Sequence, residues 1–359
     1  MGGGLLILTQ KVDIDDDVLG FFHGWILEFA KNCEKVTVVC LEKGEFDLPE
    51  NVAVFSLGKE KIGNWKLEIG KKLLYIFRFY KYIWKERRNY DIIFVHMNSE
   101  YVILGAPLWK LFGKKIGLWY AHKAVNLKLR VAEKFADKIF TVTKEGFRLK
   151  SKKLVILGHG IDIGKCQMQN ENCKIKEETF FKVIYVGRIS PIKNQKLAVE
   201  AADILINKEK MRNVKFKFIG APIYEKDKIF FNELTNLAKE KKLNDYIEFA
   251  GSIPHEKIFE EYSNADLSIN LCPTGGPDKA VLESMARGCL VFAYNKAFEN
   301  ILPKELILNT SDKNELAEKI KWAVNLGDGC KKELRKVMIE EIRKNHNLWK
   351  LIRDIVREL

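Results

Sequence analysis

Residues 183–193 read Val-Ile-Tyr-Val-Gly-Arg-Ile-Ser-Pro-Ile-Lys. The apolar residues at its start predict a buried strand that ends at Gly187, and a loop with Arg188 leads into a helix that begins near Lys193. Two cations at the carboxyl end of a strand, beside a helix N-terminus, suit a diphosphate group. Taken alone, the same pair is equally compatible with two solvated basic residues on a turn.

The alternation of strand and helix extends from this segment in both directions. Continuous apolar runs predict buried strands at Leu5–Thr9, Lys35–Leu41, Asp91–His96, Lys115–Tyr120, Lys138–Val142, Leu154–Leu157, Val183–Val186, Val214–Ile219, Tyr246–Phe249, Leu267–Leu271 and Leu290–Ala293. Amphipathic segments predict helices near 193–207, 225–242, 279–288, 313–326 and 331–359. This order indicates an α/β protein whose parallel sheets are covered on both faces.

The alternation lapses over residues 158–180, which are polar and rich in glycine. A chain of 359 residues is too long for one ordinary core. We therefore expect two doubly wound, Rossmann-like domains, at 1–162 and 163–340, and a C-terminal helix at 341–359 that packs back on the first domain. Ligands bind such sheets at the carboxyl ends of their strands.

A second informative segment, residues 272–289, reads Cys-Pro-Thr-Gly-Gly-Pro-Asp-Lys-Ala-Val-Leu-Glu-Ser-Met-Ala-Arg-Gly-Cys. Gly275 and Gly276 allow the backbone to approach a ligand closely, and the helix that follows directs its free N–H groups toward that loop. Glu283 lies about one turn into this helix, where it can accept hydrogen bonds from ribose hydroxyls. The alternative is a simple turn followed by a surface carboxylate.

Together the two segments resemble the GT-B fold glycosyltransferases of family 4, the glycosyl transferases group 1. The resemblance rests on Gly187-Arg188 with Lys193 and on Glu283-Ser284-Met285-Ala286-Arg287-Gly288, and it extends to Gly158–Asp162 and to 345–359. It implies two Rossmann-like domains facing a central cleft. It also implies metal-independent transfer, with retention at the anomeric carbon, of a sugar from a UDP- or GDP-linked donor to a glycan or lipid-linked acceptor. The donor is a substrate, so we expect no cofactor.

The resemblance also assigns roles to residues of the second domain. Arg188 and Lys193 would bind the donor diphosphate, and Glu283 would bind the nucleotide ribose. Fixed cations of this kind can stabilise a leaving diphosphate without a metal ion.

One departure from the family pattern affects the donor sugar. The first Glu of the family's Glu-x7-Glu segment falls at position 275, where this chain has glycine. We expect Gly275, Gly276, Asp278 and Lys279 to contact the donor sugar or nucleotide, with Asp278 as the replacement carboxylate. The alternative is that Asp278 only complements the helix dipole.

In the first domain the resemblance points to two positions. Gly20 resembles the second glycine of the family's Gly-Gly loop and is assigned to the diphosphate. His122 follows a predicted strand, where family members carry a histidine that faces the reacting sugar, and it is our candidate catalytic residue. Asp17 and His23 are candidates for acceptor contacts. The three consecutive aspartates at 15–17 suggest a metal, but one loop offers too few converging carboxylates, so we expect none.

The net charge of +13 is concentrated in part of the chain. Residues 59–90 carry ten Lys/Arg and three Glu, a net +7. On a helix over this segment, Lys71, Arg78, Lys81, Lys85 and Arg88 fall within about 100° of arc. We expect Leu73, Ile76, Phe77, Tyr80, Ile83 and Trp84 to face the core. Tyr75, Phe79 and Tyr82 then lie outside the core-facing side, beyond the basic stripe.

A basic stripe edged with aromatic residues suits an anionic membrane surface. Arg78, Lys81 and Lys85 are the candidates for that contact or for the acceptor, and a solvated helix face is the alternative. We expect no nucleic-acid partner, because no nucleic-acid-binding motif is recognisable. No signal peptide or spanning helix is predicted, so the expected location is cytoplasmic, peripheral on the inner face of the cell membrane.

Seven cysteines are scattered without a disulfide or zinc spacing, and we expect free thiols. The favoured function is a glycosyltransferase of the hexosyltransferase type, in polysaccharide biosynthesis. Two alternatives stay open: a non-catalytic sugar-nucleotide-binding or scaffold protein, which the loss of the first Glu would fit, and a sugar-nucleotide epimerase or hydrolase on the same fold. Fold alone does not decide between them.

Overall fold

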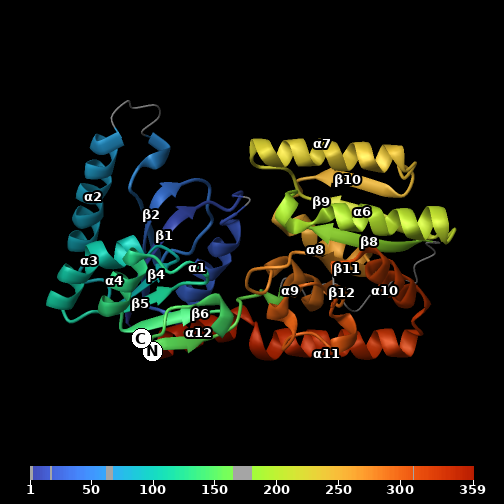
Figure 1. The fold of residues 1–359 in the computed structure, drawn as a ribbon. Coiled ribbons are helices and arrows are strands. Elements are labelled where there is room, and N and C mark those ends of the chain that lie inside the picture. Colours follow the sequence, from blue (N-terminus) through green and yellow to red (C-terminus); the bar gives the residue numbers. More distant parts are fainter. Residues whose placement is uncertain (1–2, 17, 62–67, 165–179, 310) are drawn as a thin grey trace. The chain divides into compact units, whose positions relative to one another are not determined.

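Two parallel β-sheets organise the chain, each in its own compact unit (Figure 1). The computed structural model describes residues 3–16, 18–61, 68–164, 180–309 and 311–359. Unit 1 comprises Met1–Asp162 and Asn347–Leu359, and unit 2 comprises Ile163–His346. The α/β class and the doubly wound, Rossmann-like sheets predicted from the sequence are confirmed.

Unit 1 contains a seven-stranded parallel sheet in the order β3-β2-β1-β4-β5-β6-β7. The order reverses between β1 and β4, which makes this the topological switch point, where ligands bind in open α/β sheets. The elements are β1 Gly4–Val12, α1 Gly20–Asn32, β2 Lys35–Lys43, β3 Val52–Ser56, η1 Lys59–Lys61, α2 Glu68–Lys85, β4 Ile92–His96, α3 Ser99–Leu111, β5 Lys115–Trp119, α4 Leu127–Phe135, β6 Lys138–Thr141, η2 Lys144–Gly146, β7 Leu154–Ile156 and α12 Leu348–Glu358.

Alternate residues of the strands fill two separate cores, one on each face of this sheet. On β1, Leu5 and Ile7 pack with α1 and α12, whereas Leu6 and Leu8 pack with α2, α3 and α4. Successive side chains of a strand point to opposite faces, so an uninterrupted apolar run requires helices on both. The continuous strands of the sequence therefore predicted this layering.

The C-terminal helix α12 is an integral part of unit 1. Asn347 caps it, with Oδ1 accepting from the Trp349 backbone N–H at 2.8 Å, and Leu348 N–H donates to the Ile161 carbonyl at 3.0 Å. A Cβ on Gly160 would lie 2.8 Å from Leu348 Cδ1, so a larger residue there would require the packed side chains of α12 to shift. The single helix expected at 341–359 is instead two, because the chain breaks between α11 and α12 at His346 and Asn347.

Unit 2 contains a five-stranded parallel sheet in the order β10-β9-β8-β11-β12, with its switch point between β8 and β11. The elements are β8 Phe181–Val186, η3 Pro191–Lys193, α6 Gln195–Asp203, η4 Ile204–Lys208, β9 Val214–Ile219, α7 Glu225–Glu240, β10 Ile247–Gly251, α8 His255–Asn264, β11 Leu267–Asn270, α9 Lys279–Ala286, β12 Leu290–Ala293, η5 Lys296–Phe298, η6 Lys304–Leu306, α10 Lys313–Asn325 and α11 Asp328–Asn345. Helix α6 contacts both α7 and α10, and helix α9 contacts both α8 and α11.

Two predictions about single elements differ from the structure. Strand β3 was not expected; residues 52–55 are apolar, but all residues of the strand are only half-buried. The helix expected from Lys193 begins at Gln195, because Asn194 adopts a left-handed conformation with φ 57° after a short 3-10 turn. Lys193 therefore lies on the loop side of the helix.

The face predicted for α2 is largely wrong, although the expected core residue Ile83 is buried. Phe79 is buried too, and Tyr75 and Tyr82 pack beside it, whereas the expected core residues Leu73, Phe77, Tyr80 and Trp84 are exposed and Ile76 is half-buried. The helix carries aromatic residues on opposite sides, so its periodicity alone did not identify the inner one. Arg78 also points inward, and its Nη1 donates to the Leu57 carbonyl at 2.7 Å.

Two further observations concern chemistry outside the sheets. Cys33, Cys40, Cys272, Cys289 and Cys330 are free thiols, as expected, and the other two cysteines lie outside the described residues. Among the helices that the structure describes, none combines the length and the apolar character needed to span a bilayer.

Candidate active site

The switch point of unit 2 brings together the two segments that the sequence singled out. The loop after β8 carries Arg188 and Lys193, and the loop after β11 leads to Asp278 at the start of α9. Because β8 and β11 are neighbouring parallel strands, both loops leave the same edge of the sheet. Two polar segments 85 positions apart in sequence thus form one site.

Tyr185 links these two loops from inside β8. Its hydroxyl donates to the Lys193 carbonyl and accepts from the Leu271 N–H, at 3.2 Å for the latter bond. The side chain is buried, and burial raises the pKa of Tyr185, so the hydroxyl keeps the proton that it donates. One buried phenol therefore fixes the spacing of the two site loops.

The Arg188 side chain is held by the loop and helix that follow β9. Its guanidinium lies 5.3 Å from the centre of the Tyr224 ring, and its Nε is 3.8 Å from the buried carboxylate of Asp227. The Arg188 carbonyl accepts from Gln195 Nε2 at 2.9 Å. The side chain is nevertheless about one-third exposed, so a guanidinium with a fixed position faces solvent at the switch point.

Glycines allow the loop after β8 and the loop after β9 to touch. A Cβ on Gly220, which has φ 134°, would lie 2.2 Å from the Gly187 carbonyl oxygen. Only glycine is compatible with both this contact and this backbone conformation. The loops after β8 and β9 therefore touch at Gly187 and Gly220, next to the backbone of Arg188.

Asp278 connects the cation of one loop to the helix of the other. One of its oxygens binds Lys193 Nζ and accepts from Asn270 Nδ2 at 3.0 Å, and the other accepts from the Ala280 N–H at 3.4 Å and so caps α9. Burial acts to raise the pKa of Asp278, but the Lys193 ammonium and the hydrogen bonds outweigh it and hold that pKa below its ordinary value.

Glu283 lies on α9 one turn beyond Lys279, as predicted. The carboxylate is buried, and its Oε1 is 3.7 Å from Lys279 Nζ in an i,i+4 pair. Lys279 is about one-quarter exposed, so this pair presents its positive member to solvent.

Gly275 adopts a conformation that the expected glutamate would not. Its φ is 122°, in the region that favours glycine, whereas the nearest atom to an added Cβ, Asn295 Nδ2, is 4.0 Å away. Backbone strain, and not lack of space, therefore separates this loop from a family member with Glu at this position. An added Cβ on Gly276 meets no atom of the described chain within 4 Å.

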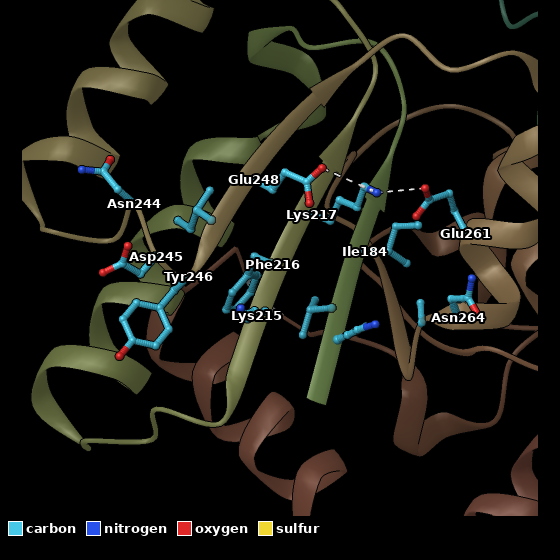
Figure 2. A pocket seen from close by; sticks show the side chains of 14 residues that line it. Ile184, Lys215, Phe216, Lys217, Asn244, Asp245, Tyr246, Glu248, Glu261 and Asn264 are labelled. Carbon is cyan, nitrogen blue, oxygen red and sulfur yellow. Dashed lines mark hydrogen bonds and ion pairs between the residues drawn. The ribbon is translucent and has the colours of Figure 1, made fainter. Parts of the chain in front are cut away.

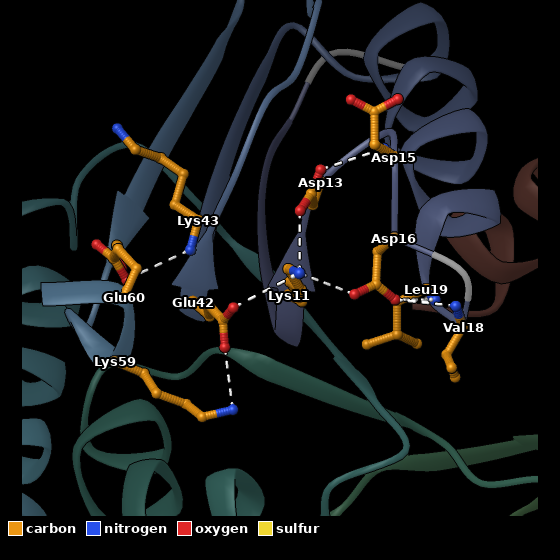
Figure 3. Close-up of polar contacts among 11 residues, drawn as sticks. Lys11, Asp13, Asp15, Asp16, Val18, Leu19, Glu42, Lys43, Lys59 and Glu60 are labelled. Atoms are coloured by element: carbon orange, nitrogen blue, oxygen red, sulfur yellow. Dashed lines mark hydrogen bonds and ion pairs between the residues drawn. The ribbon is translucent and has the colours of Figure 1, made fainter. Parts of the chain in front are cut away.

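Charged residues gather at the carboxyl ends of β1 and β2 in unit 1. Lys11 Nζ lies 2.9 Å from Asp13, 2.8 Å from Asp16 and 3.5 Å from Glu42, as Figure 3 shows. Hydrogen bonds to Asp16 and then Asp13 raise the pKa of Lys11. The aspartate loop therefore already encloses a cation, the lysine ammonium. Asp17 itself lies outside the described residues.

The other predicted residues of unit 1 take different positions. Gly20 begins α1, and a Cβ there would lie 2.8 Å from the Ile14 carbonyl oxygen, so the loop closes tightly on it. His122 is exposed in the loop after β5, where its Nδ1 accepts from the Ala124 N–H at 3.0 Å. His23 is buried in α1, and its Nε2 accepts from the Asp47 N–H at 3.1 Å.

Residues 167–345 match the model of the family "Glycosyl transferases group 1". The chain contains a group 1 glycosyltransferase domain. All the donor residues described above, from Arg188 to Glu283, lie within it.

Two curated proteins that are similar to part of this chain are mannosyltransferases. The chain is 27% identical over 116 residues to the human GDP-Man:Man(3)GlcNAc(2)-PP-Dol alpha-1,2-mannosyltransferase, and 27% identical over 143 residues to the Dictyostelium discoideum protein of that name. These matches cover 32% and 38% of this chain. They cover 24% and 28% of the relatives, so the chain spans about a quarter of their length.

Solved structures establish the fold of the whole chain. Anabaena HepE in complex with UDP aligns over 99% of this chain and 98% of its own, with a TM-score of 0.75 and 16% identity. HepE with UDP-glucose and the sucrose-phosphate synthase of Thermosynechococcus elongatus both align with a TM-score of 0.73, at 14% and 16% identity. The HepE–UDP-glucose alignment covers 99% of this chain and 100% of that one; for the synthase the shares are 99% and 98%. The protein has the GT-B type of fold, built from two Rossmann-like units.

A hollow of about 360 Å³ lies elsewhere on unit 2, over the first halves of β8, β9 and β10 (Figure 2). Lys217 bridges it by ion pairs to Glu261 at 2.8 Å and Glu248 at 3.6 Å. None of the predicted site residues lines it, and it lies away from the carboxyl ends of the strands. The chemistry of the switch point is therefore separate from this hollow.

Sequence reasoning missed the residues that hold the site together: Tyr185, Asn270, Tyr224 and Asp227. Two of them carried a local signal. Asn270 is a polar residue at the end of a buried strand, and Asp227 stands at the third position of a helix, where it completes a capping box. The pattern showed that these two residues were unusual. It did not show what they contact, because their partners are distant in sequence.

Proposed function

We propose that the protein is an enzyme that transfers a sugar from a nucleotide diphosphate sugar, UDP- or GDP-linked, to a glycan or lipid-linked acceptor. The observation that carries the proposal is the placement of Arg188 and Lys193 at the switch point of a group 1 glycosyltransferase domain. The similarity to GDP-mannose-dependent relatives and to HepE bound to UDP supports a nucleotide-sugar donor and leaves both bases open.

The two cations, Arg188 and Lys193, would stabilise the leaving diphosphate. As the bond between the anomeric carbon and the diphosphate breaks, charge develops on the leaving phosphate oxygen. Arg188, held by Tyr224 and Asp227, and Lys193, held by Asp278, are preorganised to stabilise it. Transfer then needs no metal ion. Retention at the anomeric carbon follows from the family resemblance and is part of the proposal.

We assign the remaining residues by unit, with the donor nucleotide bound mainly by unit 2 and the acceptor by unit 1. In unit 2, Glu283 binds the ribose, and Gly275, Gly276, Asp278 and Lys279 border the donor sugar. In unit 1, Gly20 contributes to the diphosphate and His122 is the catalytic candidate that faces the reacting sugar, with His23 and Asp17 toward the acceptor. The buried position of His23 makes it a weaker ligand than exposed His122.

The enzyme would act in polysaccharide biosynthesis from the cytoplasmic side, peripherally at the membrane. The basic segment 59–90 of unit 1 supports this location, since it concentrates positive charge on a protein whose acceptor we propose to be membrane-linked.

Thermal-shift titration tests the donor site directly. The protein is titrated with UDP- and GDP-sugars and with the free nucleotides, and a ligand at 100 times its Kd should stabilise it by about 2.7 kcal/mol. Arg188→Ala and Glu283→Ala should abolish the shift. Arg212→Ala, an exposed arginine before β9, is the matched control and should keep it.

Product analysis separates the alternatives. Transfer to an acceptor in the presence of EDTA, with the donor's anomeric configuration retained by NMR, supports the full proposal. Release of free sugar without transfer would indicate a hydrolase, and isomerised donor would indicate an epimerase. Binding of no nucleotide by the wild-type protein would refute the donor site.

A further inference from the structure

Helix α2 presents a ridge of large apolar side chains to solvent. Leu73, Phe77, Tyr80 and Trp84 are exposed by 63%, 66%, 38% and 51% of their surface. At 100° per residue these four positions fall within about 60° of arc, so they form one line along the helix. A continuous apolar surface of this kind on a folded protein marks a contact with another molecule or a membrane.

The orientation of α2 is fixed by its other side. Phe79 is buried and lies 5.9 Å from the Tyr101 ring and 6.1 Å from the Trp109 ring of α3, and Ile83 is buried beside them. Arg78 is bound to the Leu57 carbonyl. The ridge therefore cannot turn inward without breaking the packing of α2 on the core.

The ridge continues onto the end of α3, which lies beside α2 in Figure 1. The Trp84 ring is 5.7 Å from the ring of Phe112, and the neighbouring Leu111 is 77% exposed. Arg87 packs against Trp84: its guanidinium lies 4.5 Å from the centre of the Trp84 ring, and its Nη1 donates to the Trp84 carbonyl at 2.8 Å. The Trp84 ring thus connects the apolar line of α2 to the end of α3, and we call this surface the α2–α3 ridge: Leu73, Phe77, Tyr80 and Trp84, next to the end of α3.

Positive charge surrounds the ridge. Lys72, Lys81, Lys85 and Arg88 are exposed. Residues 71–88 carry seven Lys/Arg and one Glu, a net +6, and that glutamate, Glu86, is buried. An apolar line with a basic border complements a bilayer whose headgroups are anionic. Leu73 and Leu111 offer no ring for base stacking, which favours lipid over nucleic acid.

We propose that the α2–α3 ridge inserts into the interfacial layer of an anionic bilayer, with Lys81 and Lys85 at the lipid headgroups. This deepens the membrane association proposed above and reverses its geometry, because the aromatic residues predicted to face the core are the ones that meet the lipid. Trp84 with Arg87 suits the depth where aromatic and polar groups meet. The contact is independent of sugar transfer, so the two proposals can fail separately.

Vesicle co-sedimentation of the full-length protein tests the ridge. Vesicles of phosphatidylcholine with 30% phosphatidylglycerol, at low salt, should bind the protein, and pure phosphatidylcholine should bind it at least about tenfold more weakly. Leu73→Ser with Phe77→Ser should weaken binding to the anionic vesicles at least about tenfold. Ile229→Ser, an exposed apolar residue on α7 of unit 2, is the matched control and should bind as the wild type does.

Charge and depth are tested separately. Lys81→Glu with Lys85→Glu should weaken binding, whereas Lys332→Glu with Lys336→Glu, an exposed i,i+4 pair on α11, should not. Brominated lipid should quench tryptophan fluorescence, and Trp84→Phe should remove most of that quenching. The proposal is overturned by no binding to anionic vesicles, by equal binding of the ridge variant and its control, by quenching that survives in Trp84→Phe, or by tighter binding to single-stranded RNA than to vesicles. Circular dichroism and thermal denaturation of the same variants, without nucleotide, show that each is folded.

Discussion

Asp278 binds the ammonium of Lys193, although 85 positions separate the two residues in the chain. The carboxylate is a counter-ion that an incoming diphosphate must compete with, and it also fixes where Lys193 points. These two effects act in opposite directions on ligand affinity and on catalysis, so they can be told apart.

Asp278→Asn should raise the affinity for nucleotide diphosphate and lower kcat. The amide can still cap α9 but carries no charge, so Lys193 gains affinity for free nucleotide diphosphate while it loses its fixed position. We expect UDP or GDP to bind a few-fold more tightly and kcat to fall about tenfold or more, measured by calorimetry and by steady-state transfer. Asp245→Asn, an exposed residue of the same unit, is the control. Weaker nucleotide binding would instead make Asp278 a direct ligand.

Tyr185→Phe should loosen the site without emptying the core. Removing the hydroxyl leaves the Lys193 carbonyl and the Leu271 N–H without this bond, which costs about 1–3 kcal/mol for buried groups. Urea denaturation should show this loss, and nucleotide affinity should drop with it. Tyr246→Phe, half-buried at the start of β10, should change neither. A variant with wild-type affinity would show that the bridge does not position the loops.

Restoring the family's glutamate by Gly275→Glu should not improve donor binding. With φ at 122°, any side chain strains the loop by about 1–3 kcal/mol. Gly275→Ala and Gly275→Glu should therefore lose similar stability in thermal denaturation, and both should bind the donor more weakly. A gain of affinity in the glutamate variant alone would mean that the loop relaxes and that the missing carboxylate can act from this position.

Lys11→Met should expose a cluster of like charges. Asp13, Asp16 and Glu42 each lie within 3.5 Å of the ammonium, and all of these groups are less than one-third exposed. Loss of the shared cation should lower the stability by about 1–3 kcal/mol. Sodium chloride should recover part of this loss, because it screens the repulsion. Thermal denaturation at low and high salt measures both effects; equal salt dependence of variant and wild type would contradict the account.

His346 should make the protein less stable in mild acid. Burial lowers its pKa to about 4 from the ordinary 6.5, so between these values the unfolded chain binds a proton that the folded chain does not. Its contribution is present above pH 6.5 and is lost as the pH falls toward 4, by roughly 3 kcal/mol. Denaturation midpoints from pH 7.5 to 4.5 should therefore fall less steeply for His346→Gln than for wild type.

The sequence predicted the framework well where burial acts on both sides of a strand. Runs such as residues 5–9 and 183–186 read correctly because parallel strands between two helical layers are apolar at every position. Strand β3 was missed although residues 52–55 are all apolar. Its residues are only half-buried, so a short apolar run does not by itself indicate how deeply a segment is buried.

The α2 helix shows a different limit. Leu73, Phe77 and Trp84 form as good an apolar face as Phe79 and Ile83, and periodicity cannot say which of two such faces meets the core. The decision lies in contacts with α3 and with the loop at Leu57, which are distant in sequence.

In the candidate site, the sequence located the charged residues and missed their supports. Arg188 and Lys193 stood out as cations at a strand end, whereas Tyr224 and Tyr185 read as ordinary residues of a helix start and a buried strand. What makes them part of the site is the strand order, which places the loops after β8, β9 and β11 together. That order follows from the fold, which a single segment does not contain.

The closure of unit 1 by α12 has a consequence for how the chain is made. The apolar surface of unit 1 that α12 covers, which includes Trp25 and Phe29, stays uncovered until Asn347–Leu359 has been synthesised, and unit 2 is synthesised in between. Unit 2 is one continuous segment and can fold as it emerges from the ribosome. The first unit to leave the ribosome is thus the last to be completed, and its apolar surface is exposed to chaperones and proteases throughout the synthesis of the second.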